Sequence, residues 1–183
     1  MNVPLELSYT VEEWQTIPDC DRFELLDGRL AARTMGAQSS LAAANVVRLL
    51  GNHAEAQKLG KVLGADGAFQ LFPDHPNRVR IPDASFVRQD RLPDGEVPEG
   101  HFRFPPDLAI EAVSPTDVAI EVDEKIEEYL RAGVPLVWVL FPRTRVVMVY
   151  RADGTVSRLR GDNELSGETV VAGFRCRVAD LLS

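Results

Sequence analysis

The chain has few of the features that mark secreted, membrane-bound or redox-active proteins. Its 183 residues include two cysteines, Cys20 and Cys176, which lie far apart and have no CxxC spacing. They therefore indicate neither a zinc knuckle nor a redox pair, and we expect a reducing, cytoplasmic compartment. No apolar run approaches the ~20 residues of a membrane span. The first eight residues lack a basic segment followed by an apolar stretch, so we expect no signal peptide and no membrane partner.

An excess of basic residues is also missing. The formal net charge is −8 and the sequence pI is about 4.9, whereas general nucleic-acid binders usually show a basic face or a high pI. This composition argues against tight non-specific DNA binding. The densest cationic stretch includes Arg78, Arg80 and Arg103, and acidic residues are mixed into it. We expect these arginines to be solvated, with contact to phosphate as the alternative.

Several catalytic motifs are absent as well. We find no glycine-rich phosphate loop, no Gly-x-Ser-x-Gly turn and no dinucleotide-binding fingerprint. These absences argue against nucleotide triphosphatases, serine hydrolases and Rossmann oxidoreductases. The three histidines, His53, His75 and His101, have no metal-ligand spacing.

The pattern that is present predicts alternating strands and helices in one domain spanning residues 1–183. Thr10 and Glu13 form a capping-box sequence before a short helix, and Asp27-Gly28 indicates a hairpin. Gly60 is a plausible stop for the second helix, and Gly133 is the expected C′ glycine of the third. The predicted helices are 39–58 and 116–132 after the first short one, and the predicted strands are 23–26, 29–34, 64–72, 79–87, 107–113, 136–141, 145–151 and 155–160.

These elements predict an α/β (mixed α+β) fold in which one mixed sheet is flanked by helices. An N-terminal hairpin and C-terminal strands are added to this core. The unit from 107 to 141 should form a right-handed parallel crossover. Residues 89–104 contain prolines and glycines and read as a long surface loop.

Lys125 is the most informative single residue. On a helix with 100° per residue, Val122, Lys125 and Tyr129 fall within about 40° of Val118, so a lysine lies inside the apolar stripe. A buried ammonium is costly unless it meets a carboxylate or another acceptor. The alternative is that Lys125 lays its stem on apolar surface and lifts its head into water.

Two carboxylates upstream could meet this ammonium. Glu111 interrupts the apolar run 107–113, which is typical of a strand buried on both faces. Asp83 follows Pro82, whose missing N–H indicates an irregular strand. Mg²⁺ usually takes one or two carboxylates and completes its shell with water and phosphate oxygens. Asp83, Glu111 and Lys125 together suggest a metal-dependent phosphodiesterase, although sequence separation gives no geometry.

A wider set of motifs resembles a known family. These motifs are the run 23–28 around Glu24, Pro82-Asp83, the run 106–115 around Glu111, Lys125, and the run 129–134. Together they are similar to the Uma family of "putative restriction endonucleases" in the PD-(D/E)XK nuclease superfamily, and the resemblance extends over about residues 9–182. It implies a restriction-endonuclease-like core, Mg²⁺ or Mn²⁺ as cofactor and DNA as substrate.

The resemblance also implies roles for individual residues. Asp83 and Glu111 correspond to metal ligands, and Glu24 corresponds to an acidic residue from an N-terminal element. The superfamily lysine position is occupied by Val113, so Lys125 would supply the lysine from the helix. Many relatives carry a histidine near the start of the second helix, where this chain has Met35-Gly36-Ala37-Gln38-Ser39-Ser40.

The leading hypothesis is a Mg²⁺- or Mn²⁺-dependent endonuclease that hydrolyses DNA phosphodiester bonds. The alternative is a catalytically degenerate homodimeric binding or regulatory module of the same fold, and a weaker possibility is hydrolysis of another phosphoester. A homodimer is expected because enzymes that cut both DNA strands usually need two active sites. Purely structural roles for the same residues also stay open. Glu24 could pair with Arg22 and Arg29, Asp83 could cap a turn, and Glu111 and Lys125 could form a structural ion pair.

Overall fold

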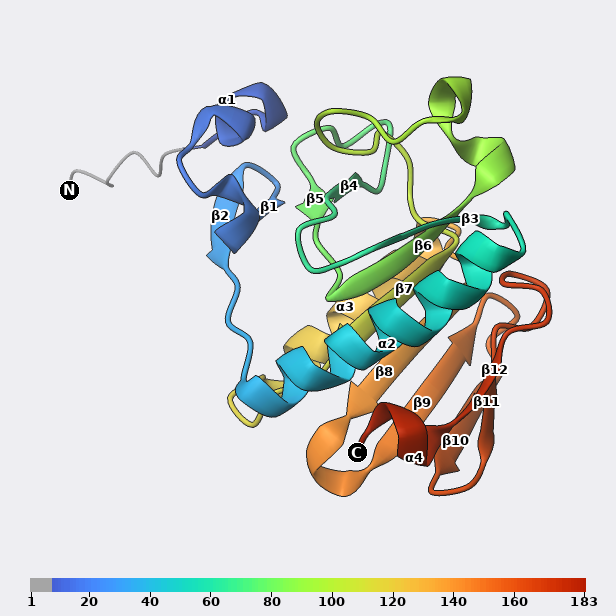
Figure 1. Cartoon of the computed structure of the whole chain (residues 1–183). Helices are drawn as coiled ribbons and strands as arrows, with labels where there is room; N and C mark the ends of the chain where they lie inside the picture. Colours follow the sequence, from blue (N-terminus) through green and yellow to red (C-terminus); the bar gives the residue numbers. More distant parts are fainter. Residues whose placement is uncertain (1–7) are drawn as a thin grey trace.

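A six-stranded mixed sheet forms the centre of the structure (Figure 1). The computed structural model describes residues 8–183, and the predicted absence of a signal peptide concerns residues outside that range. The strand order is β10-β9-β8-β7-β6-β3. The strands are β3 (Gly60–Leu63), β6 (Ala84–Arg88), β7 (Leu108–Ala112), β8 (Leu136–Phe141), β9 (Val146–Arg151) and β10 (Val156–Arg160).

Two helices cover opposite faces of this sheet. Helix α2 (Ala37–Ala56) crosses one face, and α3 (Ala119–Arg131) lies on the other (Figure 1). Strands β7 and β8 run parallel with Glu111 opposite Val139, so α3 is the connection of the predicted parallel crossover. The α/β (mixed α+β) fold class is confirmed.

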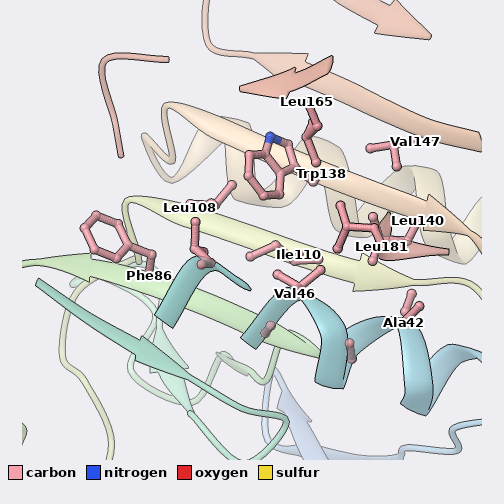
Figure 2. Packing of buried hydrophobic residues seen from close by; sticks show 14 of the residues in the cluster. Ala42, Val46, Phe86, Leu108, Ile110, Trp138, Leu140, Val147, Leu165 and Leu181 are labelled. Atoms are coloured by element: carbon pink, nitrogen blue, oxygen red, sulfur yellow. The ribbon is translucent and has the colours of Figure 1, made fainter. Parts of the chain in front are cut away.

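The apolar core beneath α2 holds the buried Trp138. Val46 and Leu50 of α2 pack on Leu108, Ile110 and Trp138, as Figure 2 shows for most of them. Alternate residues of β7 and β8 point to the opposite face, where Ala109, Val137 and Val139 meet Ile126 and Tyr129 of α3. Both sheet faces are therefore buried, which explains why 107–113 reads as an almost continuous apolar run.

We expect Ile110→Ala to lower the free energy of unfolding by about 2–5 kcal/mol, because Ile110 is fully buried and its removal leaves a cavity. Urea denaturation measures this change. Val156→Ala on the exposed edge strand is the matched control and should change stability by less than about 0.5 kcal/mol. Equal losses for the two variants would contradict the packing described.

The N-terminal hairpin belongs to a second sheet rather than to the main one. Strands β1 (Phe23–Leu26) and β2 (Arg29–Ala32) join β5 (Val79–Arg80) and β4 (Phe69–Gln70) in the order β2-β1-β5-β4. Asp27 and Gly28 have φ values of 52° and 85°, as the predicted Asp-Gly turn requires. Helix α1 (Val11–Thr16) begins with the predicted capping box and buries Trp14 against this sheet.

The predicted strand 79–87 is wrong, because the chain breaks at Ile81-Pro82-Asp83. Residues before the break are β5 of the second sheet, and residues after it are β6 of the main sheet. Pro82 has no N–H to continue a ladder. This break sets Asp83 where the two sheets meet, beside β7.

Other element boundaries also differ. Strand β3 precedes the predicted strand 64–72, of which only Phe69–Gln70 is strand. Helix α2 ends at Ala56, with Lys58 in the left-handed region at φ 53°, so Gly60 begins β3 instead of ending the helix. Helix α3 begins at Ala119, not at Thr116, and Gly133 follows it with the expected positive φ of 86°.

The C-terminal part adds a small hairpin and a last helical turn. Strands β11 (Glu164–Ser166) and β12 (Arg175–Arg177) pair with each other, and α4 (Val178–Leu181) follows. Leu165 and Leu181 complete the core under α2 (Figure 2). The loop 89–104 holds two short 3₁₀ turns, Gln89–Arg91 and Pro93–Gly95. Among residues 8–183, no helix is long and apolar enough to cross a membrane.

Candidate functional site

A cleft of about 690 Å³ opens between the second sheet, the carboxyl end of β7 and the first half of α3. All four sequence-predicted site residues line it: Glu24 from β1, Asp83 after the break at Pro82, Glu111 from β7 and Lys125 from α3. The four charged residues predicted to form the site therefore lie in one cleft, although they come from four separate segments of the chain.

Lys125 lies inside the cleft, and its side chain is only 18% exposed. Its Nζ is 2.9 Å from Glu111 Oε2 and 3.0 Å from Glu24 Oε1. Burial alone would lower the pKa of Lys125, but Glu111, Glu24 and Asp83 outweigh burial and raise it. The ammonium therefore persists at neutral pH, and the alternative of a head lifted into water is wrong.

Glu111 is a buried carboxylate with both oxygens engaged. Tyr129 Oη donates to Glu111 Oε1 at 2.8 Å, while Lys125 Nζ donates to Oε2 at 2.9 Å. Burial raises the pKa of Glu111 to about 7, and Asp83 and Glu24 add to this although Lys125 opposes it. Such a shift arises when several acids share one desolvated site, and such sites are often functional.

Asp83 is held at the rim of this acid cluster. Its Oδ2 accepts a hydrogen bond of 2.7 Å from the Ala112 backbone N–H, just past the last β6–β7 pair, Ala84 with Ile110. Its Oδ1 is 3.4 Å from Arg33 Nη2. Burial raises the pKa of Asp83 against the influence of Lys125, the Ala112 amide and Arg33. Asp83 thus bonds to strand β7 and does not cap a local turn.

Glu24 is the anion that binds the two sides of the cleft together. Its Oε2 accepts from Arg80 Nη1 at 2.8 Å, and its Oε1 accepts from the Ile81 N–H at 2.9 Å as well as facing Lys125. Burial would raise the pKa of Glu24, but Lys125, Arg80 and these hydrogen bonds lower it to about 2. The pairing of Glu24 is therefore with Arg80 and Lys125, not the expected hairpin pair with Arg22 and Arg29.

Behind Glu24 lies a buried ion network that the sequence reading missed. Glu128 of α3 is fully buried and accepts hydrogen bonds from Arg80 Nε at 2.9 Å and Nη2 at 2.6 Å. Arg78 also pairs with Glu128 and reaches Asp27 at 2.6 Å. The expectation of solvated arginines is thus wrong for Arg80, which is 8% exposed. Val79 and Ile81 point into the apolar core around Trp14 and Leu25, so strand alternation places Arg80 on the opposite face of β5. The sequence does not show that α3 covers this face, where Arg80 meets Glu128.

The segment 35–40, which precedes and begins α2, is tied to the end of β7. The Gly36 N–H donates to Ser114 Oγ at 2.9 Å, and Ser39 Oγ donates to the Val113 carbonyl at 3.0 Å. Met35 lines the cleft. Hydroxyl and backbone groups therefore fix the approach of α2 to the site.

The donor set fits a hard divalent cation bound by few protein ligands. Across residues 8–183, no three His, Cys, Asp or Glu side chains form a group that could hold an ion by themselves. Asp83 and Glu111 provide carboxylate oxygens in a shared cluster, and Mg²⁺ commonly uses one or two carboxylates with water and phosphate. The chemistry of the donors is compatible with Mg²⁺ or Mn²⁺ and unlike a zinc site.

The comparisons with known proteins agree with this architecture. The model of the Uma2 family, described as "Putative restriction endonuclease", matches residues 10–179. The chain therefore belongs to the Uma2 family, as its motifs predicted. No curated protein sequence matches the chain.

A solved structure is similar over nearly its whole length. It is described as a "putative nuclease belonging to DUF820" from Anabaena variabilis, with a TM-score of 0.81 and 20% sequence identity. The match covers 95% of this chain and 97% of that one. At this identity the likeness establishes the fold, which is the predicted nuclease-like core.

Proposed function

We propose that this protein is a Mg²⁺- or Mn²⁺-dependent endonuclease that hydrolyses DNA phosphodiester bonds with the PD-(D/E)XK type of site. The observation that carries the proposal is the convergence of Asp83, Glu111 and Lys125 in one cleft, with Nζ 2.9 Å from the Glu111 carboxylate. Membership of the Uma2 family supports DNA as the substrate.

Each site residue has a role that follows from its contacts. Asp83 and Glu111 would hold the cation, which when bound polarises the phosphate and lowers the pKa of a water molecule. Tyr129 orients Glu111 through its 2.8 Å hydrogen bond. The Lys125 ammonium stabilises negative charge that grows on the phosphate in the transition state, and Glu24 keeps Lys125 in place.

We expect Asp83→Asn and Glu111→Gln each to lower the rate of plasmid nicking by about 10³-fold in Mg²⁺ or Mn²⁺, because each removes an anionic ligand. EDTA should stop nicking by the wild type. Glu124→Gln, which removes an exposed carboxylate from the cleft rim, is the control and should retain activity within about 3-fold. Activity that survives both ligand substitutions would rule out the assignment.

The second candidate is a binding or regulatory module without catalysis. The acidic composition favours it, because a pI of about 4.9 is unusual for a protein that binds DNA through phosphate contacts. Isothermal titration with Mn²⁺ separates the two candidate functions: a folded protein that binds no Mn²⁺ at millimolar concentration would be such a module.

We also propose that the protein is a homodimer, because cutting both DNA strands needs two active sites. Analytical ultracentrifugation measures the mass of the assembly. A reducing cytoplasm is the proposed compartment, supported by the free thiols of Cys20 and Cys176.

A further inference from the structure

Arg33, which the sequence reading did not single out, lies in the wall of the cleft beside Asp83. It directly follows β2, and its side chain is 17% exposed. Its Nη1 donates to the Asp21 carbonyl at 3.0 Å and to the Ala65 carbonyl at 2.7 Å. These two bonds fix the guanidinium in position without neutralising its charge, since both acceptors are neutral.

The two other largely buried cations that line the cleft, Lys125 and Arg80, are committed to carboxylates. Lys125 is within 3.0 Å of both Glu24 and Glu111. Arg80 donates to Glu24 and Glu128 through all three of its side-chain nitrogens. Arg33 has one contact with an acid, the 3.4 Å approach of Nη2 to Asp83 Oδ1. Its charge is therefore the least compensated of the three.

We infer that Arg33 is the residue that contacts the substrate phosphate in this cleft. The inference rests on the proposed function and adds the group that recognises the anion. A phosphate bound beside Asp83 would meet the Nη2 edge of a guanidinium that is already oriented, and little ordering entropy is lost on contact. Planar N–H donors match phosphate oxygens in charge and geometry.

The acidic lining of the cleft explains why a cation beside the bound phosphate is needed. Acidic side chains from several elements face it, including Glu24, Asp83, Glu111 and Glu121. A phosphodiester entering this field is repelled unless a cation with spare charge stands beside its oxygens. Arg33 provides this positive charge beside Asp83, which is also a ligand of the proposed metal ion.

The test compares Arg33→Met and Arg33→Gln with Arg33→Lys. Arg22→Met is the matched control, because Arg22 is an exposed arginine that also lines the cleft. We expect kcat/KM for DNA cleavage to fall by about 10–100-fold in Arg33→Met and Arg33→Gln, as for loss of a charge-assisted hydrogen bond. Arg33→Lys should recover part of this loss, and Arg22→Met should stay within about 3-fold of the wild type.

Binding of a fluorescein-labelled DNA duplex, measured by anisotropy in Ca²⁺ at several salt concentrations, gives a readout that a structural role would not move. Losing one phosphate contact should reduce the slope of log K against log salt by about 0.9 in Arg33→Met and Arg33→Gln, while Arg33→Lys retains the wild-type slope. Affinity for Mn²⁺, measured by calorimetry, should be unchanged or tighter, since Arg33 no longer competes for Asp83.

Two groups of results would overturn the inference. One is an unchanged salt slope with wild-type cleavage in both neutral variants, and the other is a loss in Arg22→Met as large as in Arg33→Met. Circular dichroism checks folding, and Arg33→Gln keeps an amide donor for the two carbonyls if Arg33→Met unfolds. If the wild type cleaves no DNA, the proposed function fails by itself, while unequal salt slopes would still assign the phosphate contact to Arg33.

Discussion

Glu24→Gln should lower the free energy of unfolding at pH 7 by about 3 kcal/mol. The buried Glu24 carboxylate has a pKa of about 2 in the folded protein, because Lys125, Arg80 and the Ile81 amide outweigh the cost of burial. The ordinary pKa of a glutamate is 4.5, and the difference between the two pKa values corresponds to about 3 kcal/mol. The glutamine keeps the size of the side chain but leaves Lys125 and Arg80 with less compensation.

The pH dependence of this difference follows from the direction of the shift. A carboxyl group whose folded pKa is lowered stabilises the protein fully above its unfolded pKa of 4.5 and loses this effect as pH falls through about 2. The stability gap between wild type and Glu24→Gln should therefore shrink below about pH 4.5. Because Glu24 also helps raise the pKa of Glu111 to about 7, the gap becomes constant only above about pH 7. Denaturant titrations at a series of pH values measure it.

Asp27→Asn provides the matched control for this experiment. Asp27 also pairs with an arginine, Arg78, but its side chain is 65% exposed, and exposed pairs contribute about 0–1 kcal/mol. We expect a change of less than about 0.5 kcal/mol. A Glu24→Gln variant as stable as the wild type, or a gap that persists unchanged to pH 2, would contradict the network described.

Lys125→Met should lower DNA nicking by about 10³-fold while the protein remains folded. Methionine keeps most of the length of the largely buried Lys125 stem, so the main loss is the ammonium that we propose to face the phosphate. Single-turnover nicking kinetics measure the effect with Mg²⁺ or Mn²⁺ in excess. Calorimetry should find Mn²⁺ affinity unchanged or higher, because a positive charge has been removed beside Glu111.

Lys61→Met is the control for this substitution. Lys61 is an exposed lysine on the edge strand β3 and should tolerate the change within about 2-fold in rate. Full activity in Lys125→Met would remove Lys125 from the proposed mechanism. A loss of Mn²⁺ binding would instead make Lys125 a residue that maintains the carboxylates, not one that acts on the phosphate.

How much the sequence could predict differs between local and long-range features. The hairpin at Asp27-Gly28, the capping box at Thr10 and Glu13, and the glycine after α3 were all correct, because each depends on the backbone preferences of a few neighbouring residues. The strand 79–87 was wrong although its break also has a local signal. Val79 and Ile81 alternate before Pro82, the apolar positions change phase at Asp83, and proline cannot donate to a sheet ladder.

The candidate site shows the same division. Lys125 and Glu111 could be found because each breaks an otherwise apolar pattern. Glu128, Arg80 and Arg33 break no such pattern, and each looks like an ordinary surface charge in the sequence. They became part of the site only through contacts with segments far away in the chain, such as Arg80 with Glu128 at 2.6 Å.

The sequence by itself determined the main helices and turns of this protein and the family to which it belongs. It also showed a lysine and a glutamate where apolar residues would be expected. Periodicity and turn chemistry act over a few residues, and they are readable without coordinates. Only the tertiary structure decided which charges meet. The burial of an ion, and therefore its pKa and its partners, depends on the elements that pack around it, and neither residue type nor spacing records that packing.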